Sequence, residues 1–302
     1  MPGGNLPSAE SLFVRTHDGL RLHLCQYGDR DAPGLPVVCL PGLSRTVADF
    51  DVLAPVLAQA GPTRRVIALD SRGRGQSDYD SNPANYNVGV ELADLITVLT
   101  ALAVGPAIFI GSSRGGILTM LLAATNPAAI AGAVLHDIGP VIEPAGLVRI
   151  KGYVGKLKQP RSFADGAEIL QRLSGEQFPK LTMQDWLTAA RRAWRQDGET
   201  MTPTYDVRIA DTLTDIDVSK PLPSLWNEFD ALAGKPLLVI RGGNSDILSA
   251  GTVAAMAVRH PDLQVVNVPD QGHVPNLAGA LNARIAQFVC LCDLVHSAKP
   301  VV

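Results

Sequence analysis

The chain has 302 residues, of which 46% are hydrophobic and 18% charged, so it can bury a sizeable core and shows no sign of disorder. Its formal net charge of −3 leaves no basic footprint for nucleic acid, and we expect a small-molecule substrate. The first twelve residues have neither the basic nor the apolar region of a signal peptide, and the apolar runs are shorter than the roughly 18–20 residues of a membrane span. With four cysteines in the whole chain, these features predict a cytoplasmic monomer or homodimer that does not contact a membrane.

The first half of the chain alternates short β-rich runs with helical patterns. Residues 11–16 and 21–27 flank the turn dipeptide Asp18-Gly19 and predict an antiparallel hairpin. Four continuous apolar runs predict strands whose two faces are both covered: 35–40, 64–70, 106–111 and a run within 130–139. Helical stretches separate them at 47–60, 88–103 and 114–125. This order predicts an α/β fold with a mostly parallel, doubly wound sheet.

The alternation stops between residues 140 and 223, where we find no convincing strand. That segment contains amphipathic stretches such as 182–196 and is too long for a loop, so we expect an inserted helical cap subdomain. The α/β pattern then resumes, with expected elements at 236–242, 249–259, 263–269 and 276–295. The predicted core domain therefore consists of residues 1–139 and 224–302.

Residues 111–115 read Gly-Ser-Ser-Arg-Gly, which is the pattern G-x-S-x-G. The pattern follows an apolar strand and precedes a helical stretch, so it predicts a sharp strand-to-helix turn that lifts Ser113 out of the sheet. Free amide groups at the start of the following helix favour negative charge beside that serine. We therefore expect Ser113 to be a nucleophile.

A serine hydroxyl needs a base, and the base needs an acid to orient it. His273 follows the last predicted strand and is the expected base. Asp246 follows the strand 236–241 and completes the chain order Ser–Asp–His, so it is the expected acid. Asp137, at the end of the strand before the insertion, is the alternative acid. On this prediction Asp246→Asn slows the reaction more than Asp137→Asn.

Acyl transfer also requires donors for the developing oxyanion. We expect these to be the backbone N–H groups of Arg114, directly after the nucleophile, and of Leu43, in the loop after the strand 35–40. The side chains of Arg45, in that loop, and of Arg114 are candidate ligands for a substrate carboxylate. The alternative for Arg114 is an ion pair with an acid such as Asp137. Tyr153, Trp186 and Trp194 are candidate substrate-binding residues in the insertion, although aromatic residues at helical spacing more often form a core.

Five segments resemble motifs of the α/β-hydrolase superfamily in the expected order: 40–50, 68–80, 111–116, 241–248 and 270–277. The resemblance implies the α/β-hydrolase fold, with a mostly parallel eight-stranded sheet flanked by helices. It also implies a serine hydrolase with an acyl-enzyme intermediate, acting on a small ester or lactone without cofactor or metal. The alternatives are a C–C bond hydrolase or an acyltransferase with the same triad, and a non-catalytic hydrolase-like binding protein.

Overall fold

The computed structural model describes residues 7–214, 216–217 and 222–298. Its main feature is a sheet of eight strands in the order β1-β2-β4-β3-β5-β6-β9-β10. The strands are β1 (Glu10–Arg15), β2 (Arg21–Tyr27), β3 (Val37–Leu40), β4 (Val66–Leu69), β5 (Ala107–Ser112), β6 (Ile130–His136), β9 (Leu237–Gly242) and β10 (Gln264–Val268). Strand β2 is antiparallel to β1 and β4, and the other pairs are parallel. The expected mostly parallel, eight-stranded sheet is confirmed.

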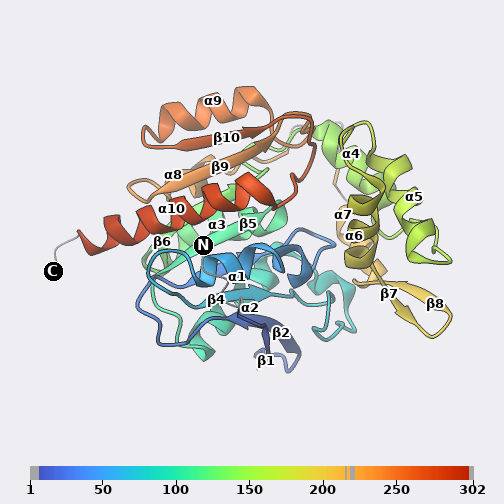
Figure 1. The fold of residues 1–302 in the computed structure, drawn as a ribbon, viewed down its shortest axis with the longest axis horizontal. Coiled ribbons are helices and arrows are strands. Elements are labelled where there is room, and N and C mark those ends of the chain that lie inside the picture. The colour runs from blue at the N-terminus through green and yellow to red at the C-terminus, as the bar shows by residue number, and fades with distance from the viewer. Residues whose placement is uncertain (1–6, 215, 218–221, 299–302) are drawn as a thin grey trace.

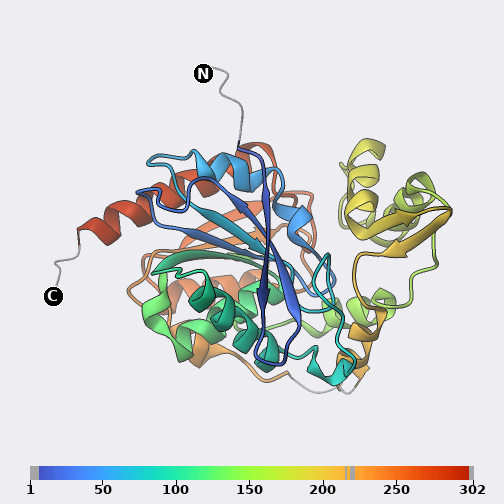
Figure 2. The same ribbon diagram turned by 90° about the horizontal axis from the view of Figure 1, so that it is seen from below.

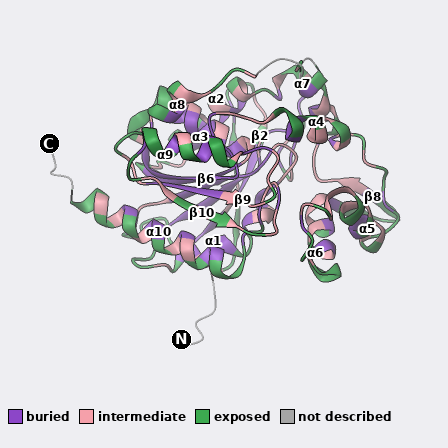
Figure 3. Cartoon of the chain, turned by 90° about the horizontal axis from the view of Figure 1, so that it is seen from above, coloured by how far each residue is buried: buried purple, intermediate pink, exposed green. Residues whose placement is uncertain are grey.

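Helices cover both faces of this sheet (Figures 1 and 3). One face carries α2 (Val88–Ala101), α3 (Arg114–Thr125), α8 (Trp226–Asp230) and α9 (Ala250–Arg259), and the other carries α1 (Leu53–Ala58) and α10 (Gly279–Ser297). Alternate residues of β5 serve the two cores: Phe109 packs with α2 and α3, whereas Ile108 and Ile110 pack with α1 and α10. This double burial explains why the strands appear in the sequence as continuous apolar runs.

Between β6 and β9 the chain leaves the sheet, and the predicted insertion, residues 140–223, falls in this interval. Its elements are α4 (Pro144–Tyr153), α5 (Phe163–Ser174), α6 (Met183–Ala193), β7 (Trp194–Asp197), β8 (Thr200–Pro203) and α7 (Asp211–Thr214). Figures 1 and 2 show α5, α6 and the β7–β8 hairpin standing beside the sheet, around a small apolar core of their own. Short 3-10 helices complete the fold at Val47–Phe50, Pro83–Asn85, Pro127–Ala129 and Val207–Ala210.

The expectation of an insertion without strands is wrong. The predicted helix 182–196 ends at Ala193, and Trp194 begins a strand that pairs antiparallel with β8. The turn between the two strands contains Gly198 at a φ of 60°, a conformation that glycine adopts at little cost. This local turn overrides the helical periodicity of the preceding residues.

The longest helix is α10, with 19 residues. No helix in the described ranges is both long and apolar enough to cross a membrane.

Candidate active site

Ser113 occupies the junction between β5 and α3. Its φ is 49°, a strained value for a residue with a side chain, and its amide donates to the carbonyl of His136 at 2.9 Å. The glycines of the motif are required by close packing. A Cβ at Gly115 would lie 2.1 Å from the carbonyl oxygen of Leu40, and one at Gly111 would lie 2.4 Å from the carbonyl oxygen of Gly115. The expected strand-to-helix turn is therefore present.

His273 lies in the loop after β10 and reaches the serine directly. Its Nε2 is 2.8 Å from Ser113 Oγ, and its Nδ1 is 2.8 Å from Oδ2 of Asp137. With Nδ1–H donating to the carboxylate, Nε2 is left as an acceptor for the serine hydroxyl. This tautomer is the one in which His273 can take a proton from Ser113.

Asp137 follows β6 and is fully buried. Its Oδ1 accepts from the amide of Gly242 at 2.7 Å, and its Oδ2 accepts from the hydroxyl of Ser245 at 2.6 Å as well as from His273. Its φ of 55° lies in the left-handed region, which aspartate tolerates better than most residues. Three donors therefore fix the carboxylate beneath the histidine.

The prediction that Asp246 orients His273 is wrong, because Asp246 binds Arg149 instead. Its two carboxylate oxygens accept from Nε and Nη2 of Arg149, on α4, at 2.6 and 2.9 Å. Burial alone would raise the pKa of Asp246, but the Arg149 guanidinium outweighs that effect and lowers it below its usual range. The alternative acid, Asp137, takes the place beside His273.

The expected oxyanion donors lie next to the nucleophile. Leu43 lines the same pocket as Ser113, and a Cβ at the preceding Gly42 would lie 3.7 Å from the Cβ of Ser113. Arg114 is the first residue of α3, so its amide has no carbonyl to bond within the helix. Among the described residues, neither of the two amides has a hydrogen-bond acceptor. Two unengaged donors beside a serine suit a developing negative charge.

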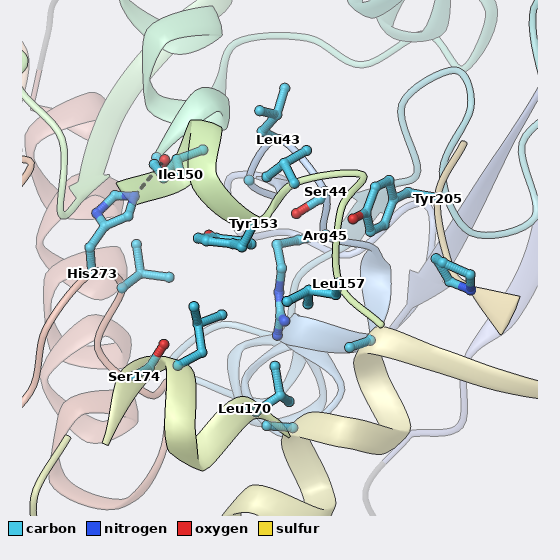
Figure 4. Close-up of a pocket in the computed structure, with 18 of the residues that line it drawn as sticks. Leu43, Ser44, Arg45, Ile150, Tyr153, Leu157, Leu170, Ser174, Tyr205 and His273 are labelled. Atoms are coloured by element: carbon cyan, nitrogen blue, oxygen red, sulfur yellow. Dashed lines mark hydrogen bonds between the residues drawn. The ribbon is translucent and has the colours of Figure 1, made fainter. Parts of the chain in front are cut away.

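A pocket opens above Ser113 and His273, between the sheet and the insertion (Figure 4). The four candidate substrate-binding residues, Arg45, Tyr153, Trp186 and Trp194, all line it. Trp186 and Trp194 are also buried in the core of the insertion, so these two residues belong both to that core and to the pocket wall. Much of the remaining wall is apolar, including Leu157, Leu170, Leu173, Phe178 and Leu181.

The side chain of Arg114 points away from this pocket. Its Nε binds Glu91 at 2.6 Å, and Glu91 also pairs with the buried Arg74 at 2.8 Å. The side chain of Arg114 is therefore held by Glu91 and does not line the pocket.

The sequence interpretation missed Ser245 and the role of Arg149. Ser245 stands directly before Asp246, and its hydroxyl holds the other carboxylate. Arg149 is one of five basic residues between positions 149 and 161, but nothing local in the sequence pairs it with a residue 97 positions away. Within the described ranges, no group of three His, Cys, Asp or Glu side chains is arranged to hold a metal ion.

Known proteins share the fold over nearly the whole chain. The family model described as "alpha/beta hydrolase fold" matches residues 36–280. The chain belongs to the α/β-hydrolase fold family. This α/β hydrolase is 32% identical over 283 residues to the 3-hydroxybutyrate-oligomer hydrolase of Cupriavidus necator, covering 91% of this chain and 95% of that protein.

Two further relatives place the α/β hydrolase among hydrolases. It is 26% identical to an sn-1-specific diacylglycerol lipase of Mus musculus, over 81% of this chain and 77% of the lipase. A solved α/β hydrolase from Novosphingobium aromaticivorans superposes with a TM-score of 0.86 at 40% identity, covering 94% of this chain and 99% of the other.

Proposed function

We propose that this α/β hydrolase cleaves carboxylic esters through a triad of Ser113, His273 and Asp137. The observation that carries the proposal is the pair of hydrogen bonds, each 2.8 Å long, that joins the serine hydroxyl to His273 and His273 to the buried carboxylate. A nucleophile bonded to a base, and the base bonded to an orienting acid, is the arrangement that acyl transfer requires.

The geometry supports a reaction in two halves. His273 Nε2 takes the proton of Ser113 as Oγ attacks the ester carbonyl, and the resulting oxyanion accepts from the amides of Leu43 and Arg114. His273 then gives that proton to the departing alkoxide oxygen, which leaves an acyl-enzyme on Ser113. A water molecule, deprotonated by His273, attacks the acyl carbon. The bond from that carbon to Ser113 Oγ then breaks, His273 returns the proton to Oγ, and the acid leaves.

In this scheme Asp137 acts through His273. It holds His273 in the productive tautomer and stabilises the imidazolium that forms in each half of the reaction. The insertion serves as a cap, because α4, α5 and α6 supply much of the pocket wall above the nucleophile.

The similarity to the oligomer hydrolase of C. necator extends over almost the full length of both chains, and it suggests short oligoesters of a hydroxy acid as substrates. The leucine-rich wall of the pocket supports this suggestion, because it offers apolar surface to short aliphatic chains. Ester hydrolysis is favoured over the other chemistries of the fold by these two observations together.

The proposal is tested with Ser113→Ala and, as a matched control, Ser112→Ala. The hydroxyl of Ser112 bonds His136 at 2.7 Å and takes no part in the proposed reaction. We expect Ser113→Ala to abolish both the hydrolysis of p-nitrophenyl butyrate and the covalent labelling by a fluorophosphonate probe. Ser112→Ala should keep the label on the peptide that contains Ser113. Hydrolysis by folded Ser113→Ala at the wild-type rate would contradict the proposal.

A further inference from the structure

The charged side chains that line the pocket beside His273 are both cationic. Within the described residues they are Arg45, from the loop that follows β3, and Arg149, from α4. Their carboxylate partners, Asp49 and Asp246, do not line the pocket. A molecule entering an otherwise largely apolar cavity therefore meets guanidinium groups and no carboxylate.

Arg45 stands close to the reacting serine. A Cβ built on Gly42 would lie 3.3 Å from Cγ of Arg45 and 3.7 Å from Cβ of Ser113, so the stem of Arg45 runs beside the nucleophile. Figure 4 shows its side chain extending into the middle of the pocket, past Tyr153 and toward Leu157 and Leu170. A bound ester could thus contact Ser113 and Arg45 at the same time.

The guanidinium of Arg45 is fixed on one edge and open on another. Its Nε and Nη2 donate to the carboxylate of Asp49 at 2.8 and 2.5 Å, whereas Nη1 has no acceptor among the described residues. Arg45 lines the pocket and its side chain is 31% exposed, whereas Asp49 is only 13% exposed and does not line it, so the counter-ion lies away from the cavity. Asp49 offsets the cost of removing the cation from water and orients the unused donors.

Arg149 extends the cationic surface from the insertion side. Asp246 holds its Nε and Nη2, and its Cζ lies 5.9 Å from the ring centroid of Tyr153. Burial raises the pKa of the Tyr153 hydroxyl, so this residue stays protonated at neutral pH and can donate a hydrogen bond.

We propose that Arg45, assisted by Arg149 and Tyr153, forms an anion subsite that binds a free carboxylate of the ester substrate. The unused edge of a guanidinium matches the geometry of a carboxylate, and a charge-assisted hydrogen bond gains strength in a pocket from which water is excluded. A neutral ester of the same size leaves these donors unpaired. The α/β hydrolase therefore selects acidic esters, and it cleaves an oligoester of a hydroxy acid near its carboxylate end. This inference rests on the proposed ester hydrolysis.

The test compares one ester in two charge states: 3-(butanoyloxy)butanoic acid, which is an anion at neutral pH, and its methyl ester. Because the methyl ester contains a second ester bond, hydrolysis of both compounds is followed as the initial rate of butyrate release. We expect the wild type to prefer the anion in kcat/KM. Arg45→Gln should lower the ratio of kcat/KM for the anion to that for the methyl ester by about 10- to 100-fold, the range for loss of a hydrogen bond to a charged group. Arg45→Lys keeps the positive charge but lacks the planar guanidinium that can bind both carboxylate oxygens, so it should restore part of the ratio.

Arg161→Gln is the matched control, because this cap arginine is 93% exposed and does not line the pocket. It should leave the ratio at the wild-type value. If Arg45→Gln does not fold, the wild type alone provides the measurement. In that case butyrate should inhibit hydrolysis of the methyl ester competitively, and butyramide should not.

The two proposals fail in different ways. If the folded wild type hydrolyses neither ester, or if hydrolysis survives in Ser113→Ala, the proposed function is wrong. If the wild type hydrolyses both esters through Ser113, and Arg45→Gln leaves their ratio unchanged, the anion subsite alone is wrong. Equal inhibition by butyrate and butyramide would also overturn the subsite.

Discussion

Replacing Asp137 with asparagine tests which carboxylate orients His273. The native carboxylate accepts from three donors: the amide of Gly242, the hydroxyl of Ser245 and Nδ1 of His273. An asparagine has the same shape but offers one oxygen and one NH₂ group. It cannot satisfy three donors that converge on two oxygens.

Both orientations of the new amide disturb the site. If its oxygen stays on Gly242, the NH₂ faces His273, and the ring must accept at Nδ1 and keep its proton on Nε2. That tautomer cannot take the proton of Ser113. If the amide flips, the NH₂ meets the buried amide of Gly242, which costs about 1–3 kcal/mol for the unsatisfied donor. We expect kcat to fall by about 10³- to 10⁴-fold, or roughly 4–5.5 kcal/mol in the activation barrier.

The matched variant is Asp246→Asn, whose carbonyl oxygen can still accept from Arg149. The side chains of this pair are 20% and 23% exposed, so we expect a stability loss of about 1 kcal/mol and a kcat within about tenfold of wild type. The assay is hydrolysis of p-nitrophenyl butyrate, with circular dichroism to show that both variants are folded. A larger loss in Asp246→Asn than in Asp137→Asn would refute the assignment of Asp137.

Three further changes test buried contacts in the core domain. Gly115→Ala should lower the unfolding free energy by about 3 kcal/mol or more in urea titrations, because the new Cβ would lie 2.1 Å from the Leu40 carbonyl oxygen. Asp293→Ala should lower the unfolding free energy by about 3 kcal/mol in the same assay, because it leaves the fully buried Arg64 guanidinium without the carboxylate that binds it at 2.9 Å. Asp293→Asn should lower the unfolding free energy less. Burial lowers the pKa of His136 to about 4, so its contribution to stability is present above the unfolded pKa of about 6.5 and is lost as pH falls toward 4. Between pH 7 and 4 the wild type should lose up to about 3 kcal/mol more than His136→Gln, and equal losses would contradict this reasoning.

The sequence predicted the sheet well because its strands are buried on both faces. Residues such as those of β5, which are all buried, give an apolar run that few other environments produce. The helix expected at 114–125 matches α3, since the glycine-rich turn marks its start. The β7–β8 hairpin was missed because its four-residue strands carry polar residues in a segment whose neighbours are helical.

The positions of Ser113 and His273 were also predictable, because each residue comes shortly after a strand of the parallel part of the sheet. The acid was not, and the reason is geometric. Strands β6 and β9 are neighbours with His136 paired to Ile240, so Asp137 and Asp246 both emerge at the same edge of the sheet. A chain order of serine, acid and histidine holds for either residue, and no local pattern separates them.

Contacts distant in sequence make the choice between these two acids. The loop after β9 turns Ser245 and the amide of Gly242 toward Asp137, and α4 brings Arg149 onto Asp246. The same contact has a consequence for the pocket. An unpaired Asp246 would place a negative charge near His273 and repel an acidic substrate, whereas the bound Asp246 lies behind a guanidinium that lines the cavity. The ion pair that removes Asp246 from the histidine therefore also places Arg149 in the pocket wall, which Arg45 lines as well, so it supports both the contact between Asp137 and His273 and the proposed preference for anionic esters.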